Sequence, residues 1–388
     1  MRLDPTMPNP NRLAVLGILA ALTACTPDDT KDSGTSGTTG TSGTTDDTGP
    51  RPPADEPGPH PVGTRADTIT TATGQTLTVQ TWYPAQADAT GDAHVYDGFI
   101  TGTALDAPAA DCSSTRPVMV FSHGNSGIRY QSIFLTEHLA SRGWVVVAPD
   151  HEGNTAFDMD TARWGELAVR RPTDLSQSFD WLVDTLSASG ADLDGCVDGA
   201  QGFAVVGHSF GGYTAVAITA ASLTAADAAA CSPGWLCAET AEYLEAHPDQ
   251  EGDLRDSRVW ATVPMTPAAF ELLAPSLPDA GVPTLVFGGS LDDLTTMDDQ
   301  VTPIYDGLGI TPKYLATLET AGHYTFSDAC SLLPTYPDCG EPYMDIPLAH
   351  QLVRGSTTAF LESLLGYDID TTGWYPLEHE LVTWTAEE

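Results

Sequence analysis

Six short apolar runs, broken at most by a single threonine, alternate with helical segments through the middle of this 388-residue chain. The runs are Pro117–Phe121, Trp144–Ala148, Phe203–Val206, Val259–Val263, Pro283–Phe287 and Tyr314–Leu318. Continuous hydrophobicity is typical of strands that are buried on both faces, and the helices between them supply the crossovers of a parallel sheet. The sequence therefore predicts an α/β fold with a mostly parallel central sheet flanked by helices.

Weaker patterns surround this alternation. Two β-rich runs, Thr68–Thr73 and Gln75–Trp82, meet at a glycine and predict a hairpin. Apolar residues recur with helical spacing over Ile133–Arg142 and over Asp174–Leu186. Residues 221–258 carry no strand pattern, and we expect a cap-like helical insertion there.

Residues 1–24 have the pattern of an export signal. Leu13–Ala24 is an apolar run behind a polar, arginine-containing start, and it is too short to cross a bilayer. Cys25 closes the run, which favours a bacterial lipoprotein signal with lipidation at Cys25. An ordinary secretory signal with an incidental cysteine is the alternative. Either signal exports the protein, so we expect it at the cell envelope, anchored in the outer membrane, or secreted.

Residues 25–61 consist almost wholly of Thr, Gly, Ser, Asp and Pro. Such a segment cannot bury enough apolar surface to offset the entropy lost on ordering, so we expect a disordered tether. Residues 62–388 then form one folded domain, which includes the insertion at 221–258. We expect this domain to be a monomer.

An excess of acidic residues excludes two classes of partner. The chain has 53 Asp and Glu against 15 Lys and Arg, which gives a formal charge of −38. Nucleic acids are bound mainly through cationic side chains, and anionic bilayers attract the same side chains. We therefore expect no nucleic-acid partner, and contact with a membrane only through a lipid anchor at Cys25.

Six further cysteines favour disulfides, because an exported domain folds in an oxidising compartment. Cys231–Cys237 and Cys330–Cys339 are spaced to clip local loops, which leaves Cys112 and Cys196 for each other. A metal site is the competing interpretation, but no C-x-x-C motif or nearby histidine pair supports it. We expect no metal and no cofactor.

The motif Gly207–Gly211, with the sequence G-H-S-F-G, is the strongest chemical signal. A serine on a sharp strand-to-helix turn needs small neighbours, because backbone segments approach one another closely there. The motif follows an apolar run and opens an alanine-rich helix, which is the context of a nucleophile elbow. Ser209 is therefore the candidate nucleophile. A glycine-rich turn without chemistry is the alternative.

A nucleophilic serine needs a base, and the base needs a carboxylate that orients it. Asp292 and Asp293 follow the fifth apolar run, and His323 follows the sixth. The order Ser, Asp, His and the position past strand ends are typical of α/β-hydrolases. We predict Ser209, His323 and Asp292 as the catalytic set, with Asp293 as the alternative to Asp292.

Attack on an ester carbonyl places negative charge on its oxygen, which preorganised N–H groups stabilise. One donor is expected to be the backbone N–H of Phe210, the residue after the nucleophile. The other is expected from the loop Ser122–Gly127, where we predict the N–H of Asn125. A plain turn is the alternative for this loop.

Several segments resemble one group of known enzymes. They are Val79–Ala85, Phe121–Gly124, Pro149–His151, Gly207–Gly212, Pro283–Asp292 and Ala321–Phe326. Together they resemble the predicted dienelactone hydrolase group of α/β-hydrolases, related to platelet-activating-factor acetylhydrolases and cutinase-like polyester hydrolases. The resemblance implies the α/β-hydrolase fold and an ester hydrolase with the triad and oxyanion hole named above.

The resemblance also implies a disulfide between Cys112 and Cys196, because the strands that follow these two cysteines are neighbours in these hydrolases. Two departures bear on the substrate. Dienelactone hydrolases use a cysteine nucleophile where this chain has Ser209, and Pro264–Ala268 stands where polyester hydrolases usually carry a substrate-clamping tryptophan. The candidates for the substrate pocket are His208, Tyr324 and Met265.

We therefore predict a serine carboxylesterase that acts on small or short-chain esters through an acyl-enzyme. A phospholipase- or lipase-like activity and a cutinase-like polyester hydrolase are alternatives, and a surface-anchored binding protein is the non-enzymatic one. The complete triad argues against the last of these. The acidic pairs Asp292–Asp293 and Asp298–Asp299 raise the question of Ca²⁺, but solvated loop acids are the favoured interpretation.

Overall fold

The computed structural model describes residues 51–72, 74–231 and 233–388. The predicted export signal, the lipidation site Cys25 and the tether up to residue 50 lie outside the described residues. In the described part of the chain, no helix is both long and apolar enough to cross a bilayer.

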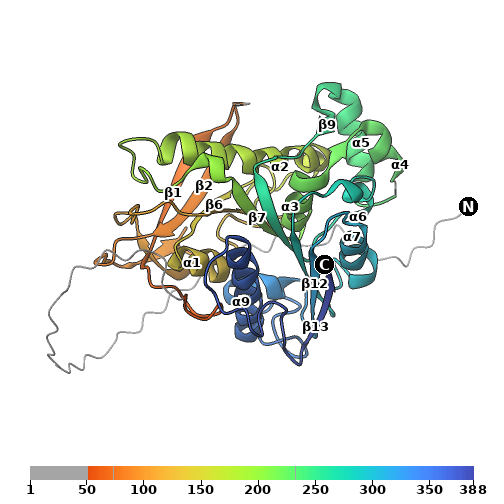
Figure 1. The fold of residues 1–388 in the computed structure, drawn as a ribbon. Helices are drawn as coiled ribbons and strands as arrows, with labels where there is room; N and C mark the ends of the chain where they lie inside the picture. Colours follow the sequence, from red (N-terminus) through yellow and green to blue (C-terminus); the bar gives the residue numbers. More distant parts are fainter. Residues whose placement is uncertain (1–50, 73, 232) are drawn as a thin grey trace, which may run out of the picture. The chain divides into compact units, whose positions relative to one another are not determined.

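A large sheet forms the centre of the described domain (Figure 1). Six parallel strands lie at its middle, in the spatial order β6-β5-β7-β10-β11-β12. These strands are β5 (Val118–Ser122), β6 (Val145–Pro149), β7 (Phe203–His208), β10 (Val259–Met265), β11 (Thr284–Gly289) and β12 (Lys313–Leu318). They coincide with the six apolar runs, so the predicted mostly parallel sheet is confirmed.

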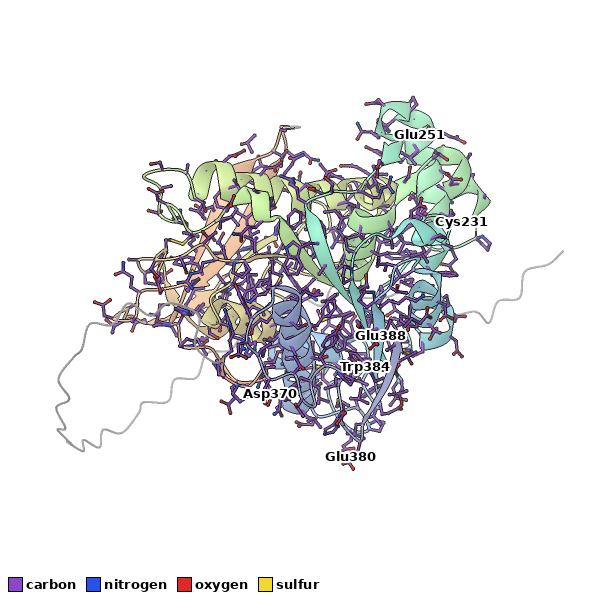
Figure 2. All side chains as sticks on the ribbon, viewed as in Figure 1. Cys231, Glu251, Asp370, Glu380, Trp384 and Glu388 are labelled. Atoms are coloured by element: carbon purple, nitrogen blue, oxygen red, sulfur yellow. A yellow bond between two sulfur atoms is a disulfide. The ribbon has the colours of Figure 1, made fainter. Side chains whose placement is uncertain are left out.

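Strands of more polar sequence extend the sheet at both edges. They are β1 (Val62–Thr70), β2 (Thr76–Pro84), β3 (Ala93–Tyr96), β4 (Ile100–Asp106) and β13 (Val382–Glu387). The antiparallel pair β1–β2 is the predicted hairpin, and β2 joins β6. Strand β13, which carries Trp384 (Figure 2), lies at the other edge, and the Trp384 ring packs against Tyr314 of β12. Strands β3, β4 and β13 were not predicted, because edge strands with an exposed face lack the continuous apolar signal.

Helices cover both faces of the sheet (Figure 1). One face carries α1 (Ile133–Ser141) and α9 (Ile346–Leu364), and the other carries α2 (Trp164–Trp181), α3 (Phe210–Ala220) and α7 (Thr302–Gly307). Short helices α6 (Phe270–Leu273) and α8 (Ala329–Leu332) lie in the connections. Along β5, Met119 and Phe121 face the core under α1, while Val118 and Val120 face the core under α2. This two-sided burial explains why the strands read as continuous apolar runs.

Helix α2 begins at Trp164, well before the predicted start at Asp174. A proline inside a helix removes the hydrogen bond to the carbonyl four residues earlier, and Pro172 therefore obscures the helix in the sequence. Here that carbonyl, of Ala168, accepts a hydrogen bond of 2.9 Å from the Tyr213 hydroxyl. This tertiary contact replaces the missing N–H, and the helix continues through Pro172.

The predicted tether ended at residue 61, and the structure corrects this boundary. Residues 51–61 lie against the domain, because Ala54 is fully buried and Arg51 donates to the Arg142 carbonyl at 2.7 Å. Arg142 and Glu362 form a wholly buried ion pair at 2.8 Å, and the Arg142 guanidinium also donates to carbonyl oxygens of this segment. A buried guanidinium needs such acceptors, so residues 51–61 belong to the folded domain.

The insertion at 221–258 is helical, as expected, and carries the tiny pair β8 (Ser222–Leu223) and β9 (Gly252–Asp253). Its helices are α4 (Ala225–Ala230) and α5 (Cys237–Ala246), with Cys231 and Glu251 at its outer end (Figure 2). Helix α5 packs on α2 at Gly165, where a Cβ would overlap the backbone carbonyl of Glu239. Trp235 of the insertion also packs against Phe210 at the start of α3, with ring centroids 5.2 Å apart, so the insertion lies beside the start of both helices.

The described residues contain three disulfides, and they are the pairs that the sequence predicted. They are Cys112–Cys196, Cys231–Cys237 and Cys330–Cys339. The first joins the segments that lead into the neighbouring strands β5 and β7, so it ties two distant parts of the chain at one edge of the core. The other two close short loops.

Candidate active site

Ser209 occupies a sharp turn between β7 and α3. Its backbone angles are φ 59° and ψ −117°, a region that residues other than glycine rarely adopt and that marks stored strain. The two flanking glycines make the turn fit, since a Cβ at Gly207 would overlap the Gly211 carbonyl and a Cβ at Gly211 would overlap the Ser122 carbonyl. The Ser209 N–H donates to the Met265 carbonyl at 2.9 Å. The structure therefore has the geometry of a nucleophile elbow.

Asp292 and His323 form a buried pair at the carboxyl ends of β11 and β12. The His323 Nδ1 and the Asp292 Oδ2 lie 2.8 Å apart. The other carboxylate oxygen accepts the N–H groups of Leu294 and Thr295, each at 2.8 Å. Burial pushes the pKa of Asp292 up, but hydrogen bonds from His323 and Thr295 hold it below its ordinary value. Asp293 points to solvent, so the structure brings Asp292 rather than Asp293 to the histidine.

His208 connects the elbow to the loop that carries His323. Its Nε2 lies 2.9 Å from the His323 carbonyl oxygen, and its Nδ1 lies 2.8 Å from Nε2 of Gln131. Because a carbonyl only accepts, Nε2 carries the proton and Nδ1 accepts from the Gln131 amide. Burial lowers the pKa of His208 to about 3, which keeps the ring neutral. Ser209 and His323 are thus held on adjoining backbone segments.

Two of the three predicted pocket residues do not line a pocket. Met265 has no exposed surface and His208 is 2% exposed, so both lie beneath the elbow. Their burial follows from their positions in β7 and β10, which are central strands. Tyr324 is half-buried, and its ring edge faces the His323 ring with centroids 5.4 Å apart. Only Tyr324 of the three is exposed enough to meet a substrate.

The two predicted oxyanion donors both border Ser209. Phe210 is the first residue of α3, so its N–H has no acceptor within the helix. The loop that carries Asn125 passes directly over the elbow, since a Cβ at Gly124 would lie 3.3 Å from the Ser209 Cβ. The side-chain Oδ1 of Asn125 accepts a hydrogen bond of 2.8 Å from Asn154. The arrangement is suited to stabilising an oxyanion next to a nucleophile.

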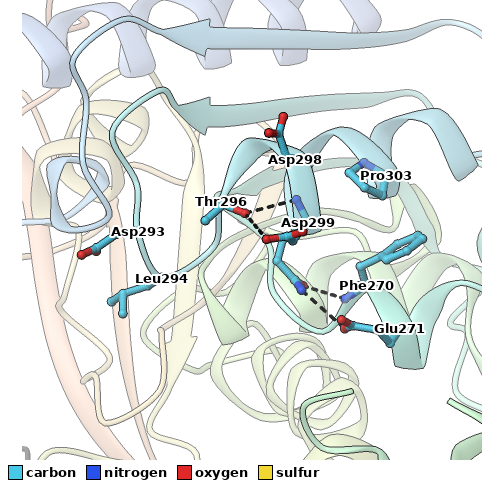
Figure 3. Close-up of a pocket in the computed structure, with 9 residues that line it drawn as sticks. Phe270, Glu271, Asp293, Leu294, Thr296, Asp298, Asp299 and Pro303 are labelled. Atoms are coloured by element: carbon cyan, nitrogen blue, oxygen red, sulfur yellow. Dashed lines mark hydrogen bonds between the residues drawn. The ribbon is translucent and has the colours of Figure 1, made fainter. Parts of the chain in front are cut away.

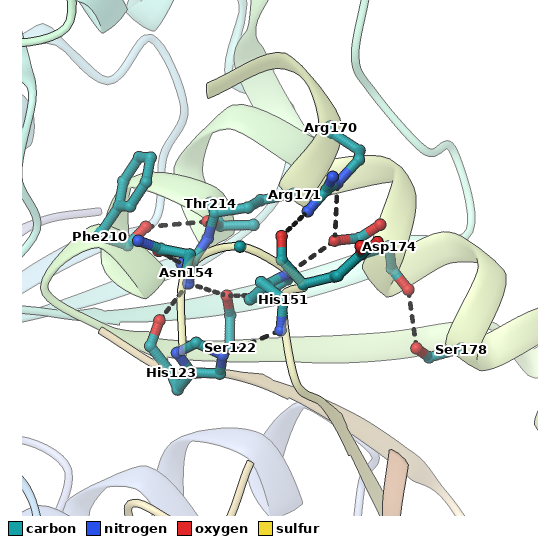
Figure 4. Close-up of polar contacts among 12 residues, drawn as sticks. Ser122, His123, His151, Asn154, Arg170, Arg171, Asp174, Ser178, Phe210 and Thr214 are labelled. Carbon is teal, nitrogen blue, oxygen red and sulfur yellow. Dashed lines mark hydrogen bonds and ion pairs between the residues drawn. The ribbon is translucent and has the colours of Figure 1, made fainter. Parts of the chain in front are cut away.

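A second Ser-His-Asp set lies nearby, and sequence reasoning gave it no role. His151 contacts Ser122 Oγ through Nε2 at 3.0 Å and Asp174 through Nδ1 at 2.8 Å (Figure 4). Burial raises the pKa of Asp174 to about 7 and lowers that of His151 far below its ordinary value. Ser122 and His151 have no exposed surface, so this set cannot attack a substrate. It stabilises the backbone under the Asn125 loop.

An acidic cleft opens beside the Asp292 loop (Figure 3). Its volume is about 530 Å³, and it is lined by Phe270, Glu271, Asp293, Leu294, Thr296, Asp298, Asp299, Gln300 and Pro303. Thr296 donates to the Asp299 carboxylate at 3.0 Å and accepts from the Asp299 N–H, which is a helix cap. Both oxygens of Asp292 are taken by the contacts described above, so that residue offers no free ligand to a cation.

Two comparisons with known proteins found similarities to esterases. The family model for platelet-activating factor acetylhydrolase, isoform II, matches residues 100–163. That stretch contains Asn125 and Asn154 but none of Ser209, Asp292 and His323. A cutinase, est1 of Thermobifida alba, is 26% identical over 229 residues, which is 59% of this chain and 59% of the cutinase. The chain thus spans a little over half the length of that relative.

The mostly parallel sheet with helices on both faces is consistent with an α/β-hydrolase fold, and the two similarities are to an acetylhydrolase family model and to a cutinase. The disulfides are typical of proteins that fold outside the reducing cytosol.

Proposed function

We propose that this α/β-hydrolase is a serine carboxylesterase that cleaves small or short-chain esters through an acyl-enzyme. The observation that carries the proposal is the buried contact of 2.8 Å between His323 Nδ1 and Asp292, held beside the strained turn of Ser209. A carboxylate on Nδ1 leaves Nε2 of the histidine free to act as a base toward a serine.

The reaction proceeds in two halves. Ser209 Oγ attacks the ester carbonyl while His323 Nε2 takes its proton, and the resulting oxyanion is bound by the N–H groups of Phe210 and Asn125. The intermediate collapses when His323 returns the proton to the leaving alcohol. Water then attacks the acyl-enzyme in the same way and releases the acid. Asp292 keeps the imidazole in the required tautomer throughout.

A second candidate substrate class is an ester within a lipid aggregate or a polymer. Phe99 and Phe157 are 53% and 66% exposed, and their rings stack with centroids 5.9 Å apart. Phe157 lies on the loop that carries Asn154, and the exposed Leu291 and Leu294 lie within two residues of Asp292. Exposed apolar side chains around a site favour contact with an apolar surface.

The domain itself is proposed to act at the outside of the cell, held at the envelope by a lipid on Cys25 or released by secretion, and to work as a monomer. The disulfides support export. Cleavage before Cys25, if followed by acylation, would be detected by mass spectrometry of the mature chain.

The deciding experiment is hydrolysis of p-nitrophenyl esters from acetate to palmitate by the full chain and by Ser209→Ala. Activity on short chains that disappears in the variant would support the carboxylesterase, and a preference for long chains or for a polyester film would favour the second class. A fluorophosphonate probe should label the wild type at Ser209. An inert, unlabelled wild type would instead indicate a binding protein on a hydrolase fold.

A further inference from the structure

Arg171 is a completely buried cation in α2, and every nitrogen of its guanidinium has an acceptor. Nε donates to the Thr214 hydroxyl at 3.0 Å, and Nη1 donates to Oδ1 of Asn154 (Figure 4). Nη2 donates to Ser122 Oγ at 3.1 Å and to the His123 carbonyl. One side chain therefore binds β5 and the loop after it, the loop after β6, and helix α3.

Two of these contacts lead to the predicted oxyanion donors. Asn154, which accepts from Arg171, donates through Nδ2 to the Asn125 side chain at 2.8 Å. Thr214, which also accepts from Arg171, donates to the Phe210 carbonyl at 2.8 Å. The guanidinium carbon itself lies 4.5 Å from the centroid of the Phe210 ring. Arg171 thus contacts the ring of Phe210 directly and reaches the side chain of Asn125 through Asn154.

A buried cation is a costly way to fill a core, and a well-packed apolar side chain would avoid the cost. The planar fork of arginine offers donors in three directions at fixed angles, which no apolar side chain and no lysine provides. Although burial lowers its pKa to about 9, Arg171 remains charged at neutral pH. The arrangement is therefore better explained by positioning than by packing.

We propose that Arg171 is a positioning residue that fixes the separation of the Asn125 and Phe210 N–H groups around the reacting oxygen. The inference rests on the proposed serine esterase mechanism. Because those N–H groups bind the oxyanion more strongly than the ester carbonyl, loosening them should affect the transition state more than substrate binding.

The primary test is Arg171→Met, compared with Arg171→Lys and Arg258→Met in the full chain. Removing one oxyanion donor lowers kcat by about 10²–10³ in known enzymes, so a displaced pair should lower kcat by roughly 10–100-fold here. KM should stay within about threefold, since ground-state contacts are little changed. The inhibition constant of a boronic acid, which mimics the tetrahedral state, should rise with the loss in kcat. Arg171→Lys should not restore activity, because lysine keeps the charge without the fork.

Arg258→Met is the matched control. Arg258 also lies over phenylalanine rings, 5.0 Å from the centroid of Phe179, but it is at the opposite end of β7. Its removal should leave kcat and boronic-acid binding unchanged. A second variant, Asn154→Asp, keeps an acceptor for Arg171 and removes the Nδ2 donor that serves Asn125 and, more weakly, the sulfur of Met159. Because two acceptor oxygens then face each other at Asn125, this variant should reproduce part of the kcat loss even if Arg171→Met folds poorly.

Folded Arg171→Met and Asn154→Asp variants with wild-type kcat and boronic-acid affinity would overturn the inference and leave the esterase proposal intact. The inference would also be overturned if KM for the substrate and the inhibition constant of the boronic acid rose by the same factor. That result would indicate that the whole site is distorted and not the oxyanion donors alone. If the wild type neither hydrolyses esters nor reacts with a fluorophosphonate, both proposals fall together.

Discussion

The imidazole of His208 donates from Nε2 to the backbone carbonyl of His323 at 2.9 Å. The residue next to the proposed nucleophile therefore holds the loop of the proposed base. The same ring accepts from Gln131, whose Oε1 accepts the Gly124 N–H at 3.0 Å. A single pair of neutral side chains thus connects the elbow, the base and the oxyanion loop.

Replacing His208 with leucine should weaken both the fold and the reaction. It leaves the Gln131 amide and the His323 carbonyl without partners, and each unsatisfied buried group costs about 1–3 kcal/mol. Urea unfolding should report that loss, and kcat should fall by roughly tenfold as His323 gains freedom. His247→Leu, at an exposed ring in the insertion, is the control. Unchanged kcat in His208→Leu would show that the loop is held by other contacts.

The two adjacent aspartates should differ sharply. Asp292→Asn permits the wrong tautomer of His323, which lowers kcat by about 10⁴ in a serine triad. Asp293→Asn changes a solvent-exposed side chain and should retain kcat within about twofold. Steady-state kinetics on p-nitrophenyl acetate distinguishes the two. If Asp293→Asn lost more kcat than Asp292→Asn, the loop would have to adopt a different arrangement in solution, with Asp293 at the histidine.

Gly211→Ala should disable the elbow. Alanine is favoured over glycine within helices by about 1 kcal/mol, but here its Cβ would overlap the Ser122 carbonyl under the oxyanion loop. We expect lower stability and lower activity, measured by thermal unfolding and by fluorophosphonate labelling of Ser209. Gly91→Ala, which has open space around the new Cβ, should behave as the wild type. A fully active Gly211→Ala would contradict the close approach of the two segments.

The disulfides should contribute unequally to stability. Cys112 and Cys196 are separated by 84 residues, and Cys231 and Cys237 by 6. Because a cross-link restricts the unfolded chain more when its loop is longer, replacing the first pair by serine should cost about 2 kcal/mol more than replacing the second. Denaturation of the two double variants by urea tests this order. Equal losses would indicate residual structure in the unfolded chain.

Asp328 should make stability fall as pH rises. Burial raises its pKa from 3.8 to about 7, so the folded state binds the proton more tightly than the unfolded state. Its contribution is complete below pH about 4 and is lost as pH rises to about 7, by up to about 1.4 kcal/mol per pH unit. Asp328→Asn should remove this slope, since an amide oxygen can still accept the Phe134 N–H.

The measurement is the urea midpoint of wild type and Asp328→Asn at pH 5 and pH 8. The variant should gain stability relative to the wild type at pH 8. The pKa of Asp174 is raised in the same direction, but Asp174 is present in both proteins. Its contribution therefore cancels in the difference between them. If the urea midpoints of the two proteins change with pH in the same way, a group other than Asp328 causes the pH dependence.

Much of the fold and the site follows from neighbouring residues. The six central strands are largely apolar along both faces because both faces are buried, and that property is visible in any short window. The elbow is visible for a similar reason, since Gly207 and Gly211 lie within two residues of Ser209 and are required by the local close approach. The order of Ser209, Asp292 and His323 follows from strand ends that the same windows reveal.

Tertiary contacts decided the rest. The sequence left Asp292 and Asp293 as alternatives, and only the packing of the loop turns one toward His323 and the other to solvent.

Two further results depend on residues that are far apart in the chain. Helix α2 continues through Pro172 because Tyr213 supplies the missing hydrogen bond, and residues 51–61 join the domain because Arg142 needs their carbonyls. Local sequence determined the six central strands and where the reacting groups lie along the chain, but not the edge strands β3, β4 and β13. Which buried polar groups meet was settled only by the folded structure, because a hydrogen bond depends on distance and direction in space.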